Sequence, residues 1–227
     1  MNTVAASTIR VIVTGASGMV GEGVVLTCLE SPEISAVLVI GRRPCGINHP
    51  KLRELLHPDF FDISPVESSL AGYDACFFCL GVTSLGKKEA DYYRYTYTLT
   101  MHFAEVVCRQ NPGMTFCYIS GAGTDSSEKG KLMWARVKGK TENDLQQLPF
   151  RQVFLFRPGI LEPVKGSRHT LGIYRYFSWL FPLVRLLAPG RICTLRQLGT
   201  AMIAVAQKGY FTPVIEVSDM QKLSRTV

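Results

Sequence analysis

Three glycines near the start of the chain have the spacing of a turn that binds a dinucleotide phosphate. Gly15, Gly18 and Gly21 follow the apolar run Ile9–Val13 and lead into the helix-compatible stretch Val20–Leu29. A strand, a glycine turn and a helix in this order bring the N–H groups and positive dipole of a helix N-terminus to a pyrophosphate. Gly15 would make the tight turn. Gly18 would let phosphate approach the backbone, and Gly21 would let the helix pack closely on the strand.

We therefore expect dinucleotide binding at this turn. The alternative is an ordinary strand-to-helix turn with surplus glycine. The candidate contacts to the pyrophosphate are Gly15, Ser17, Gly18, Met19, Val20 and Gly21.

The residues after the second apolar run, Ala36–Ile40, indicate which cofactor binds. An NAD-binding unit has an acidic residue here that accepts a hydrogen bond from the ribose 2′-hydroxyl, but this chain has Gly41, Arg42 and Arg43. A carboxylate would repel a 2′-phosphate, whereas guanidinium groups bind phosphate bidentately. The two arginines therefore predict NADP (NADPH) rather than NAD; the alternative is that they end the strand in solvent.

Two further segments are candidates for contact with the cofactor. Asp59 and Phe60 lie at the end of a short third strand expected near Phe60–Phe61, where a carboxylate could accept from the adenine amino group. Leu80, Gly81 and Val82 end or follow the expected fourth strand, where the small Gly81 would let the ribose and phosphates approach the backbone.

A second group of chemically interesting residues lies in the middle of the chain. Ser120 follows the apolar run Thr115–Ile119, and Trp134 and Lys138 have the i,i+4 spacing that puts both on one face of a helix. Arg157, Pro158 and Gly159 follow the next expected strand, where proline and glycine are typical of a strand-terminating loop.

Together these segments resemble the short-chain dehydrogenase/reductase superfamily, and more closely its atypical group that contains the Tat-interacting oxidoreductase-like proteins. They extend over about two thirds of the chain, in order. The resembling residues are Thr14-Gly-Ala-Ser-Gly-Met-Val-Gly21, Gly41-Arg-Arg43, Asp59-Phe60, Cys79-Leu-Gly81, Ser120, Val137-Lys-Gly139 and Phe156-Arg-Pro-Gly159.

The resemblance implies a serine that orients the substrate carbonyl, a tyrosine that transfers a proton, and a lysine that contacts the nicotinamide ribose and lowers the tyrosine pKa. Ser120 and Lys138 match the serine and the lysine, but Trp134 stands in the tyrosine position. An indole N–H donates a hydrogen bond and does not titrate in a useful range. The resemblance also implies that the loop with Pro158 and Gly159 lies beside the nicotinamide.

Three interpretations of Trp134 stay open. The chain binds NADP without catalysing the usual reaction, as a redox sensor or protein-interaction regulator. Alternatively, water donates the proton, or a nearby protein group does. The candidate groups are Ser120, Thr124, Asp125 and Tyr118, of which Tyr118 is inside a strand and could point into the core. A shifted alignment would instead make Trp134 a packing residue of its helix.

The elements that position these residues alternate between strand and helix along the chain. The expected strands are Ile9–Val13, Ala36–Ile40, Phe60–Phe61, Ala75–Leu80, Thr115–Ile119 and Val153–Phe156, and the expected helices are Gly18–Leu29, Tyr92–Arg109, Lys131–Leu148 and Leu195–Gln207. Near-continuous apolar strands predict an α/β fold, a doubly wound parallel Rossmann sheet, which binds ligand at the strand C-terminal ends.

We expect one NAD(P)-binding domain over residues 1–227, in which 160–195 contribute a small C-terminal cap on the substrate side. The aromatic segment 173–187 would be a lid or part of the core; its interleaved arginines leave contact with a membrane surface or a partner as the alternative.

The composition limits partners and location. The 227 residues carry a net charge of +7, but no block of basic residues and no nucleic-acid-binding motif, so we expect no nucleic-acid partner. No run of 18 apolar residues occurs, so we expect no stable membrane insertion. The seven cysteines are an odd number and no signal peptide precedes the first strand, which favours a reduced, cytoplasmic setting.

Neither the cysteines nor the histidines predict a metal site. Cys76 and Cys79 would point to opposite faces of one strand and join the core, and the four histidines are scattered. The sequence therefore predicts an NADP-binding oxidoreductase, or an epimerase/dehydratase-like enzyme, for a small carbonyl or hydroxyl substrate. A non-catalytic NADP-binding sensor is the alternative, and a homodimer is compatible with both.

Overall fold

The computed structural model describes residues 8–163 and 188–225. Its main sheet has seven strands in the order β3-β2-β1-β4-β5-β6-β9, and every pair of neighbours is parallel. The strands are β1 (Ile9–Thr14), β2 (Ile34–Gly41), β3 (Leu52–Leu56), β4 (Ala75–Phe78), β5 (Thr115–Ile119), β6 (Gln152–Arg157) and β9 (Val214–Glu216). The order reverses between β1 and β4, which confirms the doubly wound Rossmann sheet.

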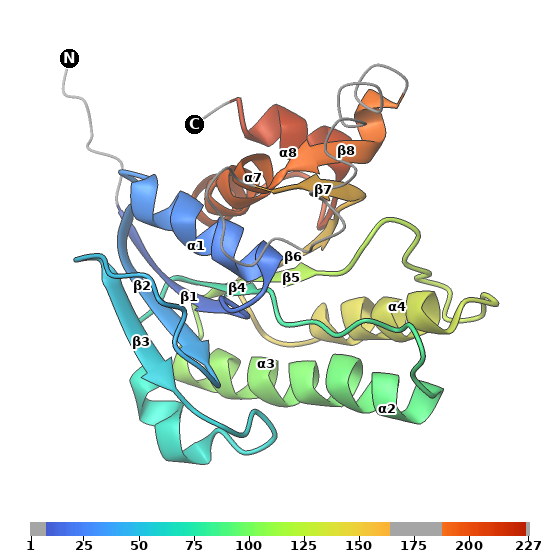
Figure 1. Cartoon of the computed structure of the whole chain (residues 1–227), viewed down its shortest axis with the longest axis horizontal. Helices are drawn as coiled ribbons and strands as arrows, with labels where there is room; N and C mark the ends of the chain where they lie inside the picture. Colours follow the sequence, from blue (N-terminus) through green and yellow to red (C-terminus); the bar gives the residue numbers. More distant parts are fainter. Residues whose placement is uncertain (1–7, 164–187, 226–227) are drawn as a thin grey trace.

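Helices cover both faces of this sheet (Figure 1). One face carries α1 (Met19–Glu30), α7 (Leu195–Lys208) and α8 (Val217–Leu223), and the other carries α3 (Leu99–Gln110) and α4 (Met133–Leu145). With a helix layer on each side, the strands are buried on both faces, which explains their continuous apolar sequences.

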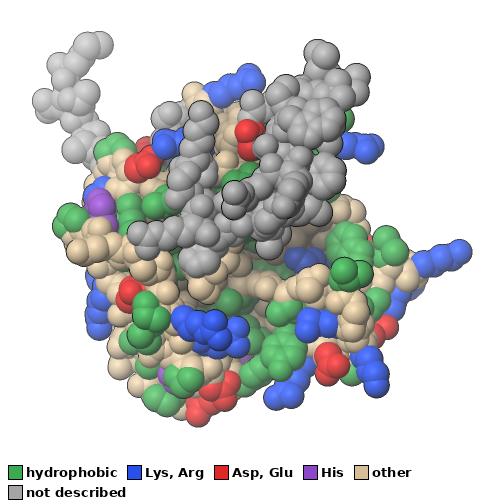
Figure 2. All heavy atoms as spheres, viewed as in Figure 1, with side chains coloured by type: hydrophobic (Ala, Val, Ile, Leu, Met, Phe, Trp, Pro, Cys, Tyr) green, Lys and Arg blue, Asp and Glu red, His purple; other side chains and the backbone are tan. Residues whose placement is uncertain are grey.

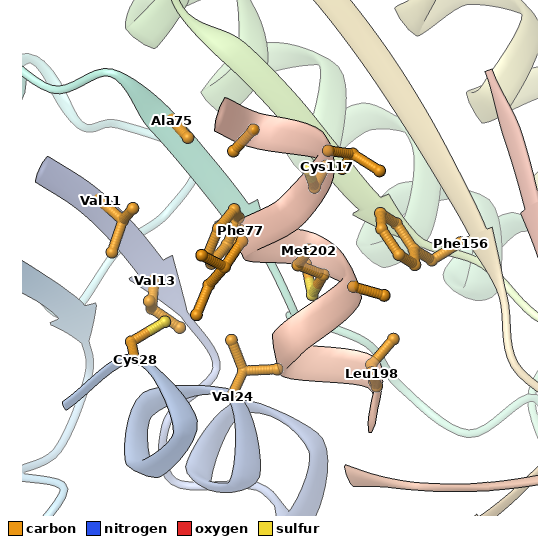
Figure 3. Packing of buried hydrophobic residues seen from close by; sticks show 14 of the residues in the cluster. Val11, Val13, Val24, Cys28, Ala75, Phe77, Cys117, Phe156, Leu198 and Met202 are labelled. Carbon is orange, nitrogen blue, oxygen red and sulfur yellow. The ribbon is translucent and has the colours of Figure 1, made fainter. Parts of the chain in front are cut away.

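The core on the α1 side is formed by alternate residues of the strands and by the facing helices. Val13, Phe77 and Cys117 point from the sheet toward Leu198 and Met202 of α7 (Figure 3), and all five are fully or almost fully buried. The intervening strand residues point to the α3 side and form a second cluster.

The expectation for the two cysteines of β4 and its end is confirmed. Cys76 belongs to the cluster on the α3 side, whereas Cys79 packs against the cluster on the α1 side. Burial raises the pKa of Cys79 to about 12 and that of Cys76 well above its ordinary value, so both are unreactive core thiols.

The expected third strand was misplaced. The strand is β3, Leu52–Leu56, at the edge of the sheet, and Phe60 lies beyond it in a turn. An edge strand pairs on one side only, and β3 exposes Arg53 and Glu54. Because of these charged residues, the sequence of β3 is not an apolar run that would predict a strand. An apolar residue occurs at position 60 because the ring packs in the core. The centroid of Phe60 lies 5.9 Å from that of Phe103.

The expected helix Tyr92–Arg109 is longer and less regular than its sequence suggested. It begins as α2 (Glu89–Tyr93), passes through a π-helical turn at Arg94–Thr98 and continues as α3. A π-helical turn inserts an extra residue and so rotates the side chains before it relative to those after it. This turn sets the direction in which Tyr95 points.

Several short elements near the C-terminus were not expected. Strand β9 extends the main sheet next to β6, and α8 follows it. Strands β7 (Ile160–Glu162) and β8 (Ile192–Thr194) pair with each other in a separate two-stranded sheet beside α7. These two strands are the described ends of the expected cap, and the aromatic segment 173–187 lies outside the described residues.

Candidate functional site

The glycine turn has the geometry that its sequence predicts. Gly15 has φ +73°, and a Cβ there would lie 2.7 Å from the carbonyl oxygen of Cys79. A Cβ on Gly21 would lie 2.2 Å from the carbonyl oxygen of Gly15, so only glycine lets α1 approach β1 this closely. A Cβ on Gly18 would meet one atom, at 3.4 Å, which leaves open space beside this residue.

The first turn of α1 leaves backbone donors available for an anion. Its N-cap, Gly18, provides no side-chain cap, and the first amides of a helix have no intrahelical acceptor. Ser17 and Gly18 are exposed, and Met19 and Val20 are partly exposed. These properties fit a pyrophosphate held by backbone N–H groups.

A pocket opens beside this turn and collects residues from four separate segments. It is lined by Arg42, Pro58, Asp59, Phe60, Phe61, Leu80, Gly81, Val82, Tyr95 and Leu99. Thr14 joins β1 to the end of β4 next to Leu80 of this lining, because its hydroxyl accepts hydrogen bonds from the amides of Cys79 (3.0 Å) and Leu80 (3.2 Å). The six candidate residues from Arg42 to Val82 in this lining were predicted from three sequence segments.

The two arginines after β2 differ in their relation to the pocket. Arg42 and Arg43 are both exposed, and neither forms an ion pair within residues 8–163 and 188–225. Arg42 lines the pocket, whereas Arg43 lies outside its lining. A group of basic side chains is visible near the centre of the face shown in Figure 2.

Aromatic side chains form part of the lining of the same pocket, and a basic side chain packs against one of them. The rings of Phe61 and Tyr95 meet edge to face, with centroids 5.8 Å apart. The guanidinium of Arg94 lies 4.8 Å from the centroid of Phe61. Sequence reasoning did not select Tyr95 or Arg94. Their position depends on the π-helical turn, which local patterns do not reveal.

Ser120 is placed at the end of β5, but its hydroxyl is engaged inside the protein. Its Oγ donates to Oε1 of Glu142 at 2.5 Å and lies 3.0 Å from the carbonyl oxygen of Phe156. Ser120 is 7 % exposed and Glu142 is 1 % exposed. A serine hydroxyl has one proton to donate, and here it is already donated in a hydrogen bond to Glu142.

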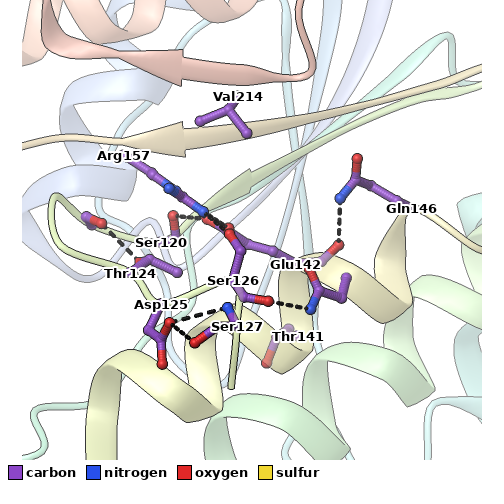
Figure 4. A network of polar contacts seen from close by, with 12 residues as sticks. Ser120, Thr124, Asp125, Ser126, Ser127, Thr141, Glu142, Gln146, Arg157 and Val214 are labelled. Atoms are coloured by element: carbon purple, nitrogen blue, oxygen red, sulfur yellow. Dashed lines mark hydrogen bonds and ion pairs between the residues drawn. The ribbon is translucent and has the colours of Figure 1, made fainter. Parts of the chain in front are cut away.

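Glu142 joins β5, α4 and β6 through Arg157 (Figure 4). The guanidinium of Arg157 donates to both carboxylate oxygens of Glu142, 3.1 Å from Nε to Oε1 and more closely from Nη2 to Oε2. Its Nη2 also donates to Oγ of Ser126 at 2.6 Å. The hydrogen bond with Glu142 raises the pKa of Arg157. Arg157 is therefore committed to an internal ion pair, and the sequence pattern gave no signal for Glu142.

Lys138 lies at the carboxyl end of β5. Its Nζ donates to the carbonyl oxygen of Ser120 at 2.6 Å and lies 3.4 Å from that of Ile119. It also lies 5.9 Å from the ring centroid of Tyr118. Burial lowers the pKa of Lys138 to about 8, against an opposing effect of Glu142.

Trp134 lies one helical turn before Lys138, near the start of α4. The tip of its indole ring would be 3.6 Å from a Cβ on Gly123, so the ring lies over the loop that follows β5. The structure thus brings Ser120, Trp134 and Lys138 to one end of β5, where the indole N–H and the lysine ammonium are candidate donors toward a ligand.

Of the loop after β6, Pro158 is buried and Gly159 is exposed. The carbonyl oxygen of Pro158 accepts a hydrogen bond from the amide of Ala122 at 2.9 Å, and a Cβ on Gly159 would lie 2.4 Å from the carbonyl oxygen of Arg191. These contacts hold the loop against the turn after β5.

The alternative proton donors near Ser120 are also engaged. Tyr118 is 1 % exposed, and burial raises its pKa above the ordinary tyrosine value. The hydroxyl of Thr124 donates to the carbonyl oxygen of Gly121 at 2.8 Å. Asp125 accepts from Ser127, which lowers its pKa, so it is an anion at neutral pH.

The described residues also limit metal and membrane binding. They contain no group of three or more His, Cys, Asp or Glu side chains that could hold a metal ion. Within the same residues, no helix is both long and apolar enough to cross a membrane.

The fold and the glycine turn define a class, the NAD(P)-binding Rossmann proteins related to short-chain dehydrogenases. Residues 11–131 match the model of the NAD dependent epimerase/dehydratase family, and the chain belongs to this family. The matched region spans β1 to the segment just before α4 and so ends before Trp134 and Lys138.

Two curated relatives show how far the likeness extends. "Protein FMP52, mitochondrial" of Chaetomium globosum is 26 % identical over 95 % of this chain and 97 % of its own length. Protein HTATIP2 of Rattus norvegicus is 27 % identical over 66 % of this chain and 62 % of its own. The HTATIP2 match confirms the resemblance inferred from the sequence motifs.

The same comparison corrects the predicted location. FMP52 proteins of several fungi, including Chaetomium globosum, Candida albicans and Emericella nidulans, are named mitochondrial. The prediction of a cytoplasmic protein is therefore wrong. It rested on cysteine usage and on the lack of a signal peptide, neither of which separates one reducing compartment from another.

Solved structures with low sequence identity share the fold. Aldohexose dehydrogenase of Thermoplasma acidophilum has a TM-score of 0.70 at 13 % identity, covering 92 % of this chain and 91 % of its own. WbmF of Bordetella bronchiseptica, in complex with NAD+, has a TM-score of 0.64 at 16 % identity. The match covers 97 % of this chain and 77 % of WbmF. L-sorbose reductase of Gluconobacter frateurii, in complex with NADPH and L-sorbose, has a TM-score of 0.61 at 11 % identity. The match covers 92 % of this chain and 93 % of the reductase.

Proposed function

We propose that this chain binds NADP across the carboxyl ends of β1, β2 and β4 and acts as an oxidoreductase on a small carbonyl or hydroxyl substrate. One observation carries the proposal. Arg42, Asp59 and Phe60 line the same pocket as the Leu80–Val82 segment, beside the uncapped N-terminus of α1. This is where the doubly wound fold binds dinucleotides.

The residues present fit a nucleotide with a 2′-phosphate. Arg42 is exposed at the pocket and forms no ion pair within the described ranges, so its guanidinium is available for an anion. Asp59 accepts from the amide of Phe61 at 2.8 Å through one oxygen, which leaves the other for an adenine amino group. The open space at Gly18 suits the pyrophosphate.

When bound, NADPH supplies a hydride for carbonyl reduction. The first turn of α1 would hold its pyrophosphate, Arg42 and Arg43 its 2′-phosphate, and Lys138 its nicotinamide ribose. Pro158 and Gly159 form the loop next to the expected nicotinamide position. The structural likeness to a dehydrogenase and a reductase supports this reaction class for the fold. The substrates of those two enzymes are not carried over to this chain.

Trp134 gives the sharpest test of the reaction. We expect Trp134→Tyr to raise the rate of NADPH oxidation by small aldehydes and ketones by about 10²-fold or more, because a tyrosine adds a titratable general acid at this position. The measurement is loss of NADPH absorbance with a panel of carbonyl compounds. Trp134→Phe is the matched control and should show no gain, because its ring has no proton to transfer.

A second candidate function is a non-catalytic NADP sensor or interaction regulator. Two observations favour it: the indole of Trp134 cannot titrate, and the hydroxyl of Ser120 is bound to Glu142. If the wild type and Trp134→Tyr both bind NADPH and neither oxidises it with any carbonyl compound, the sensor replaces the enzyme as the best account.

A further inference from the structure

Carbonyl reduction needs a proton for the substrate oxygen, and most hydroxyl groups near the end of β5 cannot give one. Ser120 donates to Glu142, and Thr124 donates to the carbonyl oxygen of Gly121. Tyr118 is buried in the core. Their protons are held inside the protein.

Lys138 differs from these groups in its position and because its ammonium keeps an N–H donor that is not used inside the protein. An ammonium has three N–H donors, and the carbonyl oxygens of Ser120 and Ile119 account for two of them, at 2.6 and 3.4 Å. The side chain is partly buried rather than fully enclosed. Lys138 thus keeps a donor and some access to solvent at the edge of the sheet.

We propose that Lys138 is the proton donor of this site: its ammonium, fixed by the two carbonyl oxygens at the end of β5, protonates the substrate oxygen directly. The inference rests on the proposed oxidoreductase function. The resemblance gives the lysine a different task, to bind ribose and to lower the pKa of a tyrosine. Trp134 stands in the position of that tyrosine, and Tyr118, whose ring centroid lies 5.9 Å from Nζ of Lys138, is buried in the core.

The step balances as a reduction. The carbonyl carbon gains a hydride from the reduced cofactor, and the carbonyl oxygen gains a proton from Nζ of Lys138. The N–H bond breaks, an O–H bond forms, and the neutral amine keeps the electron pair. The amine then recovers a proton from water at the partly exposed edge. No further oxidant or reductant is required.

The charged and titratable groups around Lys138 permit this exchange. Glu142, one turn later on α4, favours the ammonium, but its charge is shared with Arg157 of β6. Tyr118 of β5 faces the ammonium with its ring, and Tyr92 of α2 is close enough to Tyr118 to raise its pKa further. Burial outweighs Glu142 and lowers the pKa of Lys138 to about 8, so the ammonium is a better acid than that of a solvated lysine.

The first arm of the test uses Lys138→Arg. Arginine keeps the positive charge for the ribose but does not release a proton near neutral pH. We expect NADPH affinity, measured by fluorescence titration, to change little, while the single-turnover rate of NADPH oxidation falls about 10²–10⁴-fold. Lys140→Met, two residues later on α4 and outside the site, is the matched control and should leave both unchanged.

The second arm measures the ionisation of Lys138 without cofactor or substrate. The intact protein is labelled with acetic anhydride at a series of pH values, and acetylation is quantified peptide by peptide. We expect Lys138 to become reactive with a midpoint near pH 8, with the exposed Lys131 as a reference for reagent activity. The wild-type single-turnover rate should fall as pH rises through the same midpoint, because the donor must be protonated.

The outcomes separate this inference from the function on which it rests. Wild-type rates in Lys138→Arg, or a labelling midpoint in the ordinary lysine range with hydride transfer intact, would overturn the role of Lys138 alone. No hydride transfer in the wild type or in Trp134→Tyr would overturn the oxidoreductase function together with this role, whatever midpoint the labelling gives.

Discussion

The two halves of the site differ in how their polar groups are used. In the half formed by the ends of β1, β2 and β4, Arg42 and five further predicted residues line a pocket. Arg42 has no ion-pair partner within residues 8–163 and 188–225, and α1 has no side-chain cap. In the half formed by β5, α4 and β6, Ser120 and Arg157 both bind Glu142, and Lys138 binds the end of β5.

This difference indicates two kinds of site. Among the described residues, the first half presents the first amides of α1 and the exposed guanidinium of Arg42, which are donors suited to an anion. The second half satisfies its own polar groups, so its side chains stabilise the fold as much as they face a ligand. The family match covers the first half together with β5 and Ser120, and it ends at residue 131, before α4 and β6.

The largest effect should come from breaking the buried ion pair of the second half. Arg157→Met leaves the carboxylate of Glu142 buried without its cation, and removing one partner of such a pair costs about 3–5 kcal/mol. Urea unfolding should show this loss of unfolding free energy. Arg42→Met, in the first half, should cost less than about 0.5 kcal/mol. Similar losses in both variants would remove the contrast between the halves.

A smaller contrast is expected within the glycine turn. Gly21→Ala places a Cβ against the carbonyl of Gly15 and should lower the unfolding free energy by about 1–3 kcal/mol. Gly18→Ala meets little protein and should fold normally, but should weaken NADPH binding by about tenfold, because its methyl group occupies the phosphate approach. If Gly18→Ala binds NADPH like the wild type, the phosphate lies elsewhere.

The smallest effect is a dependence of stability on pH in the second half. Burial lowers the pKa of Lys138 from 10.5 to about 8, so between these values the unfolded chain binds more protons than the folded one. The unfolding free energy therefore rises with pH in this window, while below pH 8 the cost of the buried ammonium is constant. Relative to Lys138→Met, the wild type should gain about 1 kcal/mol from pH 8 to 10, reduced by partial exposure. Parallel curves for the two proteins would show an ordinary lysine pKa.

The fold was predictable because its strands are buried on both faces. Runs such as Ile9–Val13 and Thr115–Ile119 are apolar throughout, and the glycine turn fixes the start of α1. The edge strand β3 was missed for the opposite reason, since one of its sides faces solvent and it carries Arg53 and Glu54.

The candidate site was predictable where it depends on one local segment. The turn at Gly15 and the arginine at position 42 each follow a strand directly, so their place at the sheet edge followed from the strand. Glu142 was not predictable, because its partners Ser120 and Arg157 are 22 and 15 residues away and meet it only through the packing of α4 on the sheet. No local pattern records such a contact.

The most direct test of the account is calorimetric titration of the wild type, Arg42→Ala and Arg43→Ala with NADPH and with NADH. We predict that the wild type prefers NADPH, and that Arg42→Ala weakens NADPH binding by about 10–100-fold while leaving NADH binding unchanged, because a charge-assisted contact to the 2′-phosphate is lost. Arg43→Ala should have a smaller effect, since Arg43 does not line the pocket. Equal wild-type affinities for the two nucleotides, or no binding of either, would contradict the proposed NADP site.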